Sequence, residues 1–377
     1  MSLIIRRVET SSDLDKFVTY PFDLYKESPC WVPPLIAEEK KLLTPGKHPF
    51  HNHAKVALFL AQNNGRIVGR ISAHINHNHN EYHNDRTGFF GFFECCKDQE
   101  IAAALFQAAE DFVRKQGMNR LRGPMNFTTN ETCGLLINYF DEMPYIMMPY
   151  NFPYYVDLME ANGFEKSMDL FCYHLDEEIF KFDRLGSLVK RIQKRSDVNI
   201  RPIRKDRFED EVRIIQKVYN TAWKDNWGFV PMNEEEFQHM VKELKPIYDP
   251  RLLYIGEFEG KPVGFVLCLP DYNQVLSKMN GRILPFGWLK ALLNKGKINR
   301  IRIITLGVME EHRRSGLDVL FYSKIANVSP AIGKPSGEMG WILEKNVQMN
   351  RVAKSMGGRQ TKIYRIYDKN ISGGSGL

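Results

Sequence analysis

One order of predicted elements occurs twice along the chain, and this repeat restricts the possible folds more than any other feature. In each half, hydrophobic periodicity predicts a helix, a hairpin, a strand, a helix, a strand, a helix and a final strand. In the first half these elements are predicted at 11–26, 56–75, 87–95, 98–117, 119–125, 154–164 and 165–175. In the second half, after a strand at 199–204, they are predicted at 206–223, 252–270, 299–309, 313–328, 337–346, 347–358 and 361–369. Alternating strands and helices favour a mixed α/β sheet in each half, so the sequence predicts a tandem duplication.

The repeat places the domain boundaries. We predict a first domain at 1–176, a connecting segment at 177–195, a second domain at 196–370 and a disordered tail at 371–377. A length of 377 residues agrees with two domains of ordinary size. The tail "NISGGSGL" ends in small and flexible residues, which typically fray.

Composition excludes several classes of protein. With 43% hydrophobic residues the chain can bury a sizeable core, and it has no apolar run near the roughly 20 residues that span a bilayer. The opening "MSLIIRRVET" lacks the features of a signal peptide, so we expect a cytoplasmic protein. The six cysteines are scattered without a CxxC pair, which predicts reduced thiols.

The net charge and the histidine content raise two weaker alternatives, a nucleic-acid-binding protein and a metal site. The formal net charge of +7 suits an anionic ligand but is mild for a nucleic-acid-binding protein, and we expect no nucleic-acid partner. Seven of the ten histidines lie between His48 and His83, where spacings such as His79-x-x-x-His83 suit a metal. The stretch is rich in asparagine and has no cysteine nearby, so we expect a loop there and no metal.

A basic turn in the second half is the strongest candidate for a binding site. The stretch "GVMEEHRRSGLDVLFY", residues 307–322, reads as a strand end, a turn with one glycine, and an apolar helix. Such a helix start directs several backbone N–H groups at one point, and Gly316 lets a ligand approach without meeting a Cβ. Arg313 and Arg314 add charged donors, so the turn suits a diphosphate.

This turn and its surroundings resemble the GNAT superfamily of acyl-CoA-dependent N-acyltransferases over most of residues 195–370. The family's Q/R-x-x-G-x-G/A turn appears here as "RRSGLD", residues 313–318, and "GWILEKNVQMNRVAKSMGG" is similar to the family's next strand and helix. The first half resembles the same fold in "YNFPYYVDLMEANGFEK", so the chain is similar to a two-domain member. The resemblance implies a cosubstrate, acetyl-CoA or another acyl-CoA, held by Leu306, Gly307, Val308, Arg313, Arg314, Ser315, Gly316, Leu317 and Asn346.

The sequence departs from the family pattern at three places. Asp318 stands where the family has glycine or alanine, and we expect its carboxylate to be turned aside. The tyrosine that often protonates the departing thiolate is absent, because Ala353 occupies its position. In the first half, Asp98 and Ile101 stand opposite Arg313 and Gly316, so only the second half is expected to bind CoA.

The resemblance also implies catalytic and acceptor positions. A backbone N–H among Leu306, Gly307 and Val308 is expected to steady the oxyanion. Glu310 and Glu344 follow two strands that should splay apart, and either is a candidate base. For the substrate the candidates are Trp227, Phe229 and Tyr364, although aromatic residues in these positions are also typical of a core.

The residues leave the acceptor and one insertion open. A small amine, a peptide N-terminus, a lysine side chain and an aminoacylated or lipid-linked amine all remain possible acceptors. The second half alone carries a lysine-rich insertion at 272–297, which reads as a helix packed on the domain, a pocket wall, or a membrane-surface helix. We expect no membrane-spanning partner, and the oligomeric state stays open. The leading hypothesis is an N-acyltransferase, and the alternative is a catalytically silent GNAT-fold protein that binds acyl-CoA or serves as a scaffold.

Overall fold

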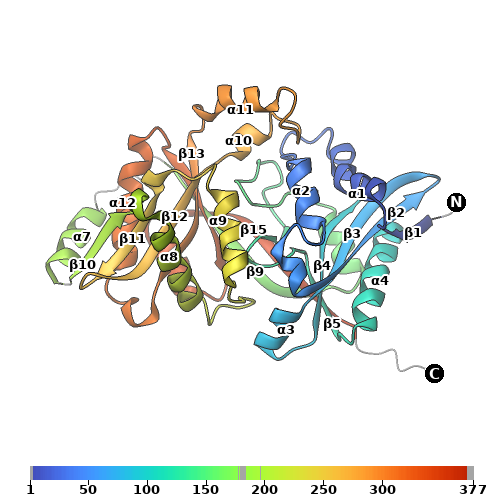
Figure 1. The fold of residues 1–377 in the computed structure, drawn as a ribbon, viewed down its shortest axis with the longest axis horizontal. Coiled ribbons are helices and arrows are strands. Elements are labelled where there is room, and N and C mark those ends of the chain that lie inside the picture. The colour runs from blue at the N-terminus through green and yellow to red at the C-terminus, as the bar shows by residue number, and fades with distance from the viewer. Residues whose placement is uncertain (1–2, 177, 179–183, 196, 372–377) are drawn as a thin grey trace. The chain divides into compact units, whose positions relative to one another are not determined.

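A computed structural model describes residues 3–176, 178, 184–195 and 197–371 (Figure 1). The chain forms two compact units. Unit 1 comprises Met1–Leu170, Val275–Leu293 and Lys362–Leu377, and unit 2 comprises Phe171–Gln274 and Asn294–Thr361.

The sheet of unit 1 is built mainly from consecutive strands. Its strands are β1 (Leu3–Arg7), β2 (Ala54–Asn63), β3 (Arg66–Asn76), β4 (Thr87–Cys95) and β5 (Arg120–Gly123), and the short strand β8 (Leu135–Leu136) pairs with β15 (Arg359–Asn370). The short strands β6 (Met125–Asn126) and β7 (Thr132–Cys133) form a separate two-stranded sheet. Its helices are α1 (Ser11–Leu24), α2 (Ile36–Leu43), α3 (His77–His83), α4 (Gln99–Lys115) and α5 (Tyr155–Ala161), with a short 3-10 helix at Pro49–Asn52. Neighbours from β1 to β4 are antiparallel, whereas β4 and β5 are parallel and joined by α4.

Unit 2 repeats this plan. Its strands are β10 (Val198–Pro202), β11 (Leu253–Phe258), β12 (Lys261–Pro270), β13 (Arg300–Val308) and β14 (Ser336–Leu343). Its helices are α7 (Arg184–Arg195), α8 (Phe208–Ala222), α9 (Glu234–Leu244), α12 (Leu317–Ala331) and α13 (Val347–Ser355), with short 3-10 helices at Lys205–Arg207, Pro250–Leu252 and Glu310–His312. Neighbours from β10 to β13 are antiparallel, and β13 and β14 are parallel and joined by α12. The predicted mixed α/β class and its duplication are therefore confirmed.

Four elements run near or through the unit boundaries. The short helix α10 (Asn273–Leu276) and the helix α11 (Gly287–Lys295) lie in the insertion between β12 and β13. Strand β9 (Glu165–Leu175) starts in unit 1 and ends in unit 2, and β15 (Arg359–Asn370) starts in unit 2 and ends in unit 1. Within unit 1, β15 pairs antiparallel with β5, with Tyr367 opposite Gly123.

Local sequence explains the main turns and cores. The hairpins turn at Asn64-Gly65 and Glu259-Gly260, where all four residues have positive φ, as a two-residue turn of this type requires. In unit 1, Ile101, Leu105 and Phe106 of α4 enter a core shared with the sheet. In unit 2, Leu317, Leu320 and Phe321 of α12 do the same. The two parallel-strand crossovers are thus helices that occupy equivalent places in the two units, and each buries apolar residues against its sheet.

Several predicted boundaries need correction. The stretch 77–83 is a helix and not a loop; it begins with an Asn76 cap, whose side chain accepts the N–H of His79 at 3.1 Å. The segments 275–293 and 362–370, assigned by sequence to the second domain, belong to unit 1. Residue 371 is buried, while 372–377 of the predicted tail lie outside the described residues. The connecting segment 177–195 holds α7, and its other residues, apart from 178, lie outside the described part.

Candidate functional site

The candidate site of unit 2 lies where two parallel strands separate. Strands β13 and β14 are paired from Arg300 opposite Ser336 to Ile303 opposite Met339. Both strands continue beyond this ladder, to Val308 and Leu343. On its other edge, β13 stays paired with β12, with a bulge where the register shifts between Leu267 and Cys268. Bulges bend and twist a strand and often occur beside active sites.

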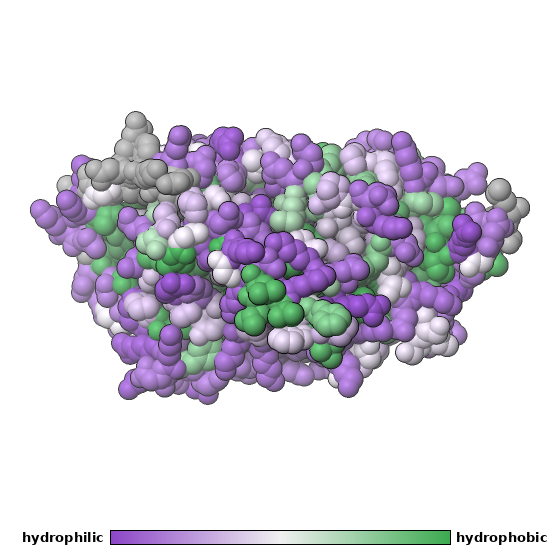
Figure 2. Space-filling view, turned by 90° about the horizontal axis from the view of Figure 1, so that it is seen from above, coloured by the Kyte–Doolittle hydropathy of each residue, from purple (hydrophilic) through white to green (hydrophobic). Residues whose placement is uncertain are grey.

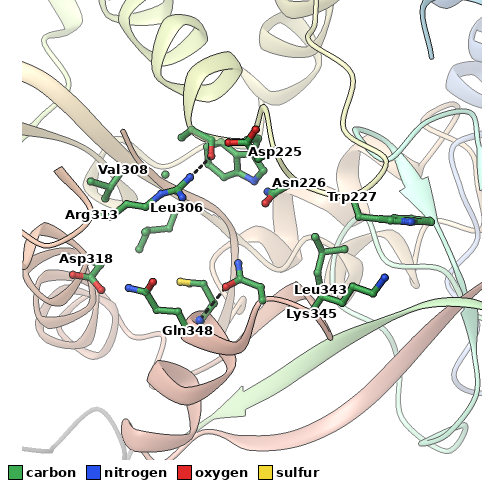
Figure 3. A pocket seen from close by; sticks show the side chains of 15 residues that line it. Asp225, Asn226, Trp227, Leu306, Val308, Arg313, Asp318, Leu343, Lys345 and Gln348 are labelled. Carbon is green, nitrogen blue, oxygen red and sulfur yellow. Dashed lines mark hydrogen bonds between the residues drawn. The ribbon is translucent and has the colours of Figure 1, made fainter. Parts of the chain in front are cut away.

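A pocket of about 410 Å³ occupies this divergence (Figure 3). Its lining comes from the end of α8, the diverging strands, and the first turns of α12 and α13. The lining residues are Ala222, Trp223, Asp225, Asn226, Trp227, Leu306, Gly307, Val308, Arg313, Asp318, Leu343, Lys345, Asn346, Gln348 and Met349. Figure 3 shows Arg313 and Asp318 at one end of the pocket and Trp227 and Lys345 at the other.

The backbone of β13 presents N–H groups to this pocket. Met309 donates its N–H to the carbonyl of Val263 on the β12 side, at 2.9 Å. Because successive N–H groups of a strand point to opposite edges, the N–H of Gly307 also faces β12. Those of Leu306 and Val308 face the edge from which β14 has diverged. Among the three predicted backbone groups, the geometry therefore favours Leu306 and Val308.

The start of α12 is shaped to receive an anion. Gly316 is the N-cap residue, with a left-handed φ of +83° that favours glycine, and it supplies no side-chain cap. The Arg313 guanidinium donates to the carbonyl of Ala222 at 3.0 Å, which holds this cation at the pocket wall. The N–H of Leu317 donates to the Ser315 hydroxyl at 3.3 Å, and the N–H groups of Asp318 and Val319 bond the Asp318 carboxyl. A phosphate would replace these partners and gain the partial positive charge of the helix start.

The equivalent helix start in unit 1 is already capped. The Asp98 carboxylate accepts the N–H groups of Glu100 and Ile101, at 2.9 and 3.2 Å. Ile101 is buried in the core of unit 1. Since its own aspartate occupies these donors, the start of α4 offers much less to an anion than the start of α12.

Asp318 is among the residues that line the pocket, and its carboxyl bonds backbone N–H groups of the first turn of α12. Figure 3 shows its carboxyl group on the first turn of α12, near Gln348. Burial raises the pKa of this carboxyl above its usual value, although backbone hydrogen bonds with Val319 and its own N–H lower it. A carboxyl group that gains a proton easily repels a phosphate less than an ordinary aspartate would.

The start of α13 forms the floor of the pocket and is held by two asparagines. Asn346 caps the helix, because its side chain accepts the N–H of Met349 at 3.1 Å. The buried Asn350 amide donates to the carbonyls of Leu343 and Asn346, both at 2.9 Å. Tyr173 donates its hydroxyl to the Asn350 side-chain oxygen, also at 2.9 Å. This network fixes the end of β14 where it leaves β13.

An aromatic wall closes the α8 side. A Cβ added to Gly307 would collide with the ring of Trp223, so this glycine lets the indole lie directly on the strand. Trp223 stacks on Tyr219, with ring centroids 4.8 Å apart. Trp227 lines the pocket as predicted for the substrate side, whereas Phe229 is core and contacts Tyr219 edge-on.

Other predicted site residues are not among those that line the pocket. Glu310 is exposed and pairs with Lys224 at 3.3 Å, and neither Glu310 nor Glu344 is among the lining residues. Tyr364 is buried in unit 1, whereas the pocket belongs to unit 2. Of the turn residues, Arg314 is exposed, Ser315 accepts the N–H of Leu317 at 3.3 Å, and Leu317 is core.

The sequence reasoning missed eight of the lining residues. They are Ala222, Trp223, Asp225, Asn226, Leu343, Lys345, Gln348 and Met349. Four of them stand at the end of the predicted helix 206–223 or beside Trp227 in "DNWGFVP", and the other four lie within three residues of Asn346. Their proximity to predicted site residues was the available signal, because no residue pattern marks a short loop as part of a pocket wall.

The histidine-rich stretch contributes to the core of unit 1. His74 is fully buried, stacks on Phe89 and contacts the carbonyl of Phe127 through Nε2 at 3.0 Å. Burial lowers the pKa of His74 to about 3. Within the described residues, no group of three or more histidine, cysteine or acidic side chains is arranged to hold a metal.

Two curated bacterial proteins are similar to this chain over nearly its whole length. The chain is 36% identical to the bacterial ceramide synthase of Caulobacter vibrioides over 374 residues, which covers 97% of this chain and 96% of the relative. It is 34% identical to protein YghO of Escherichia coli K12 over 375 residues, with 98% and 95% covered. No protein-family model matches the chain.

Among solved structures, the chain is similar to a tandem GNAT protein from the clavulanic acid biosynthesis pathway. The TM-score is 0.58, with 12% sequence identity and 99% of each chain covered. At this identity the likeness shows a common fold. Among the described helices, none is long and apolar enough to cross a membrane.

Proposed function

Since this chain belongs to the family of tandem GNAT proteins that includes the bacterial ceramide synthase of Caulobacter vibrioides, we propose that it is an acyl-CoA-dependent N-acyltransferase. The observation that carries the proposal is the pocket of unit 2, where a helix start, two strand N–H groups and an open acceptor side meet. A ceramide is an amide of a fatty acid and a long-chain amino alcohol. We therefore take a long-chain 2-amino-1,3-diol as the acceptor and a fatty acyl-CoA, in place of acetyl-CoA, as the donor.

The donor end of the pocket is the start of α12. The diphosphate of CoA would lie against the N–H groups that follow Gly316, with Arg313 beside it. The thioester would then reach the divergence of the strands. There the N–H groups of Leu306 and Val308 face the pocket and would stabilise the negative charge on the carbonyl oxygen.

The chemistry requires one nucleophile and one proton acceptor. The amine nitrogen attacks the thioester carbon, the carbon–sulfur bond breaks, and CoA leaves as a thiolate. The proton lost by the amine goes to a base, and the thiolate takes a proton from solvent or from the same group. Asp225 is our candidate base, because it lines the pocket beside Trp227, whereas Glu310 and Glu344 do not line it.

A direct assay tests the proposal. The purified chain is mixed with acetyl-CoA or palmitoyl-CoA and with sphinganine or its truncated analogue 2-aminopropane-1,3-diol. Released thiol and the N-acyl product, identified by mass spectrometry, are measured. We expect amide formation fastest with palmitoyl-CoA and sphinganine. Absence of an amide product with every pair would contradict an acyltransferase.

Matched variants assign the site in the same assay. Gly316→Glu should abolish turnover, because it adds a carboxylate beside the start of α12 and its Cβ would meet Ile192 of α7 at 2.7 Å. Gly333→Glu controls for a new carboxylate at a left-handed glycine of the same helix, and Gly316→Ala separates the contact with Ile192 from the added charge. Asp225→Asn should lower kcat by about 100-fold, as expected for loss of a general base, while Glu310→Gln should leave kcat unchanged. If Glu310→Gln lowers kcat and Asp225→Asn leaves it unchanged, Glu310 is the general base instead.

A second candidate is a protein that binds acyl-CoA without turnover. Two observations favour it: the Asp318 carboxyl in the pocket and the buried Ala353 where a tyrosine would protonate the thiolate. Calorimetric binding of palmitoyl-CoA, lost in Gly316→Glu, together with no amide product would support this alternative.

A further inference from the structure

The insertion between β12 and β13 exposes an unusual number of large apolar side chains. Ile283, Leu284, Phe286, Trp288, Leu289, Leu292 and Leu293 are all exposed, and Leu284, Phe286 and Leu292 exceed 65%. We call these seven residues the apolar patch. Figure 2 shows hydrophobic residues gathered on one face and rimmed by hydrophilic ones. Patches of this kind on a folded protein mark interaction sites.

The spacing of residues along helix α11 places its large apolar side chains on the exposed side. Gly287 is buried, and Ala291 and Asn294 are partly buried, at spacings that place all three on one side of the helix. Trp288, Leu289, Leu292 and Leu293 form two i,i+4 pairs on the exposed side. A helix that packs its small residues inward and exposes its leucines has the reverse of the usual amphipathic arrangement.

The base of the insertion is firmly attached to unit 1. Val275 and Met279 are buried. Ile36 donates its N–H to the carbonyl of Gly281 at 3.0 Å, and a Cβ on Gly281 would meet the ring of Phe22 at 2.5 Å. Because this base is packed within unit 1, the apolar patch stays on the surface, outside the core. The side of α11 that packs on the domain therefore carries its small residues, and its large apolar side chains stay exposed.

Charge identifies what the apolar patch binds. No aspartate or glutamate occurs between Asp271 and Glu310. Five exposed cations surround the patch: Lys278, Arg282, Lys290, Lys295 and Lys297. A symmetric contact between two copies of this chain would bring these like charges together. An anionic bilayer instead complements them and accepts the apolar side chains, as it does for interfacial helices rich in Lys, Trp, Phe and Leu.

The central aromatic residue agrees with insertion into lipid. Trp288 donates its indole N–H to the carbonyl of Pro285 at 2.9 Å. The polar edge of this ring is therefore paired within the segment, and moving the ring among acyl chains leaves no additional unpaired donor.

We propose that the apolar patch and its five cations dock the protein on the surface of an anionic lipid bilayer. The bilayer is not spanned: the side chains of Phe286, Trp288 and Leu292 enter the headgroup region, and the lysines contact lipid phosphates. This binding requires neither acyl-CoA nor turnover, so it stands or fails independently of the proposed function.

Vesicle binding of the full chain tests the proposal. Vesicles are made of phosphatidylcholine alone or with phosphatidylglycerol, and bound protein is measured by co-sedimentation. We expect binding to the mixed vesicles at least about tenfold tighter than to neutral ones, and weaker at high salt. Trp288 fluorescence, assigned with Trp288→Phe, should shift to the blue and be quenched by brominated lipid. Equal binding to both vesicles, or no quenching, would overturn the proposal.

Matched variants separate the patch from general stickiness. Phe286→Ser/Leu292→Ser and Lys295→Glu/Lys297→Glu should each reduce binding about tenfold. The controls Ile4→Ser/Tyr82→Ser and Lys47→Glu/Arg66→Glu alter exposed residues elsewhere and should bind like the unmodified chain. Because all these side chains are exposed, thermal melting should be unchanged. A dimer that becomes a monomer in Phe286→Ser/Leu292→Ser would assign the patch to a second copy instead.

Discussion

At the scale of single residues, Asp318 decides how the pocket treats an anion. It places a carboxyl group at the first turn of α12, where the rest of the site favours negative charge. Burial raises its pKa, so this side chain takes up a proton at a higher pH than a solvated aspartate does. The charge that opposes a diphosphate is therefore lost at a higher pH than that of a solvated aspartate.

This gives a pH-dependent prediction. Affinity for palmitoyl-CoA should fall as pH rises through the raised pKa of Asp318, because the carboxylate then carries a full charge. Above that pH, Asp318→Asn should bind palmitoyl-CoA about tenfold more tightly than the unmodified chain does. A change of about tenfold is what an interaction worth about one pKa unit produces. Calorimetry at several pH values measures the affinity of both proteins for palmitoyl-CoA. Comparing the two proteins at each pH removes the contribution of the ligand's own titration. Parallel pH curves for the two proteins would exclude this role.

The same raised pKa has a consequence for folding. The proton is bound more tightly in the folded state, so the stabilisation it gives is fully present below the unfolded pKa of the carboxyl group. It is lost as pH rises through the folded pKa. The free energy of unfolding of the unmodified chain should therefore fall as pH rises through the folded pKa of Asp318, relative to that of Asp318→Asn, and denaturant unfolding of both at several pH values measures this.

At the scale of elements, the pocket depends on how α13 holds the end of β14. Asn350 makes this connection through its amide and through the hydroxyl of Tyr173. The contacts lie behind the pocket, since neither Asn350 nor Tyr173 is a lining residue.

Removing the connection should loosen the site. We expect Asn350→Ala to lower the free energy of unfolding by about 1–3 kcal/mol, because it leaves the buried hydroxyl of Tyr173 without its acceptor and removes two side-chain hydrogen bonds. Tyr173→Phe, which removes one hydroxyl, should lower it by about 1 kcal/mol. Denaturant unfolding measures both. If the KM for palmitoyl-CoA stays unchanged in Asn350→Ala while stability falls, the network supports the fold without shaping the pocket.

Sequence patterns predicted the order of elements that the two halves repeat and missed α9, whose apolar periodicity is as strong as that of α4. Helix α4 and the hairpin at Asn64-Gly65 have clear signals and were found. Helix α9 was missed, although Asn233 and Glu236 form a capping box at its start. For the site, the glycine turn and the Asn346 cap were predictable because helix starts follow local rules. The place of Asp225, and the distance of Glu310 from the pocket, depend on tertiary packing that no local pattern encodes.

At the scale of the whole molecule, two units of one fold differ in their helix starts. Gly316 leaves the start of α12 without a side-chain cap, whereas Asp98 fills the start of α4. One unit is thus suited to an anion and the other is closed to it.

We therefore expect one acyl-CoA per chain. Calorimetric titration with palmitoyl-CoA should give a stoichiometry of one, and Gly316→Glu should remove all of it. Asp98→Ala, which opens the other helix start, should lower stability by about 1 kcal/mol through loss of the cap without adding a second site. A stoichiometry of two in the unmodified chain would show that unit 1 also binds the cosubstrate.

Strand β5 is synthesised long before β15, the strand with which it pairs. Arg122 and Asp368 form a two-point ion pair at 2.7 and 2.8 Å inside unit 1, although 246 positions separate them. While the ribosome translates unit 2, β5 has no such partner and its edge is open. Nascent chains of this protein therefore carry an unpaired strand for most of their translation, which makes this edge the expected target of chaperones and the expected point of misassembly.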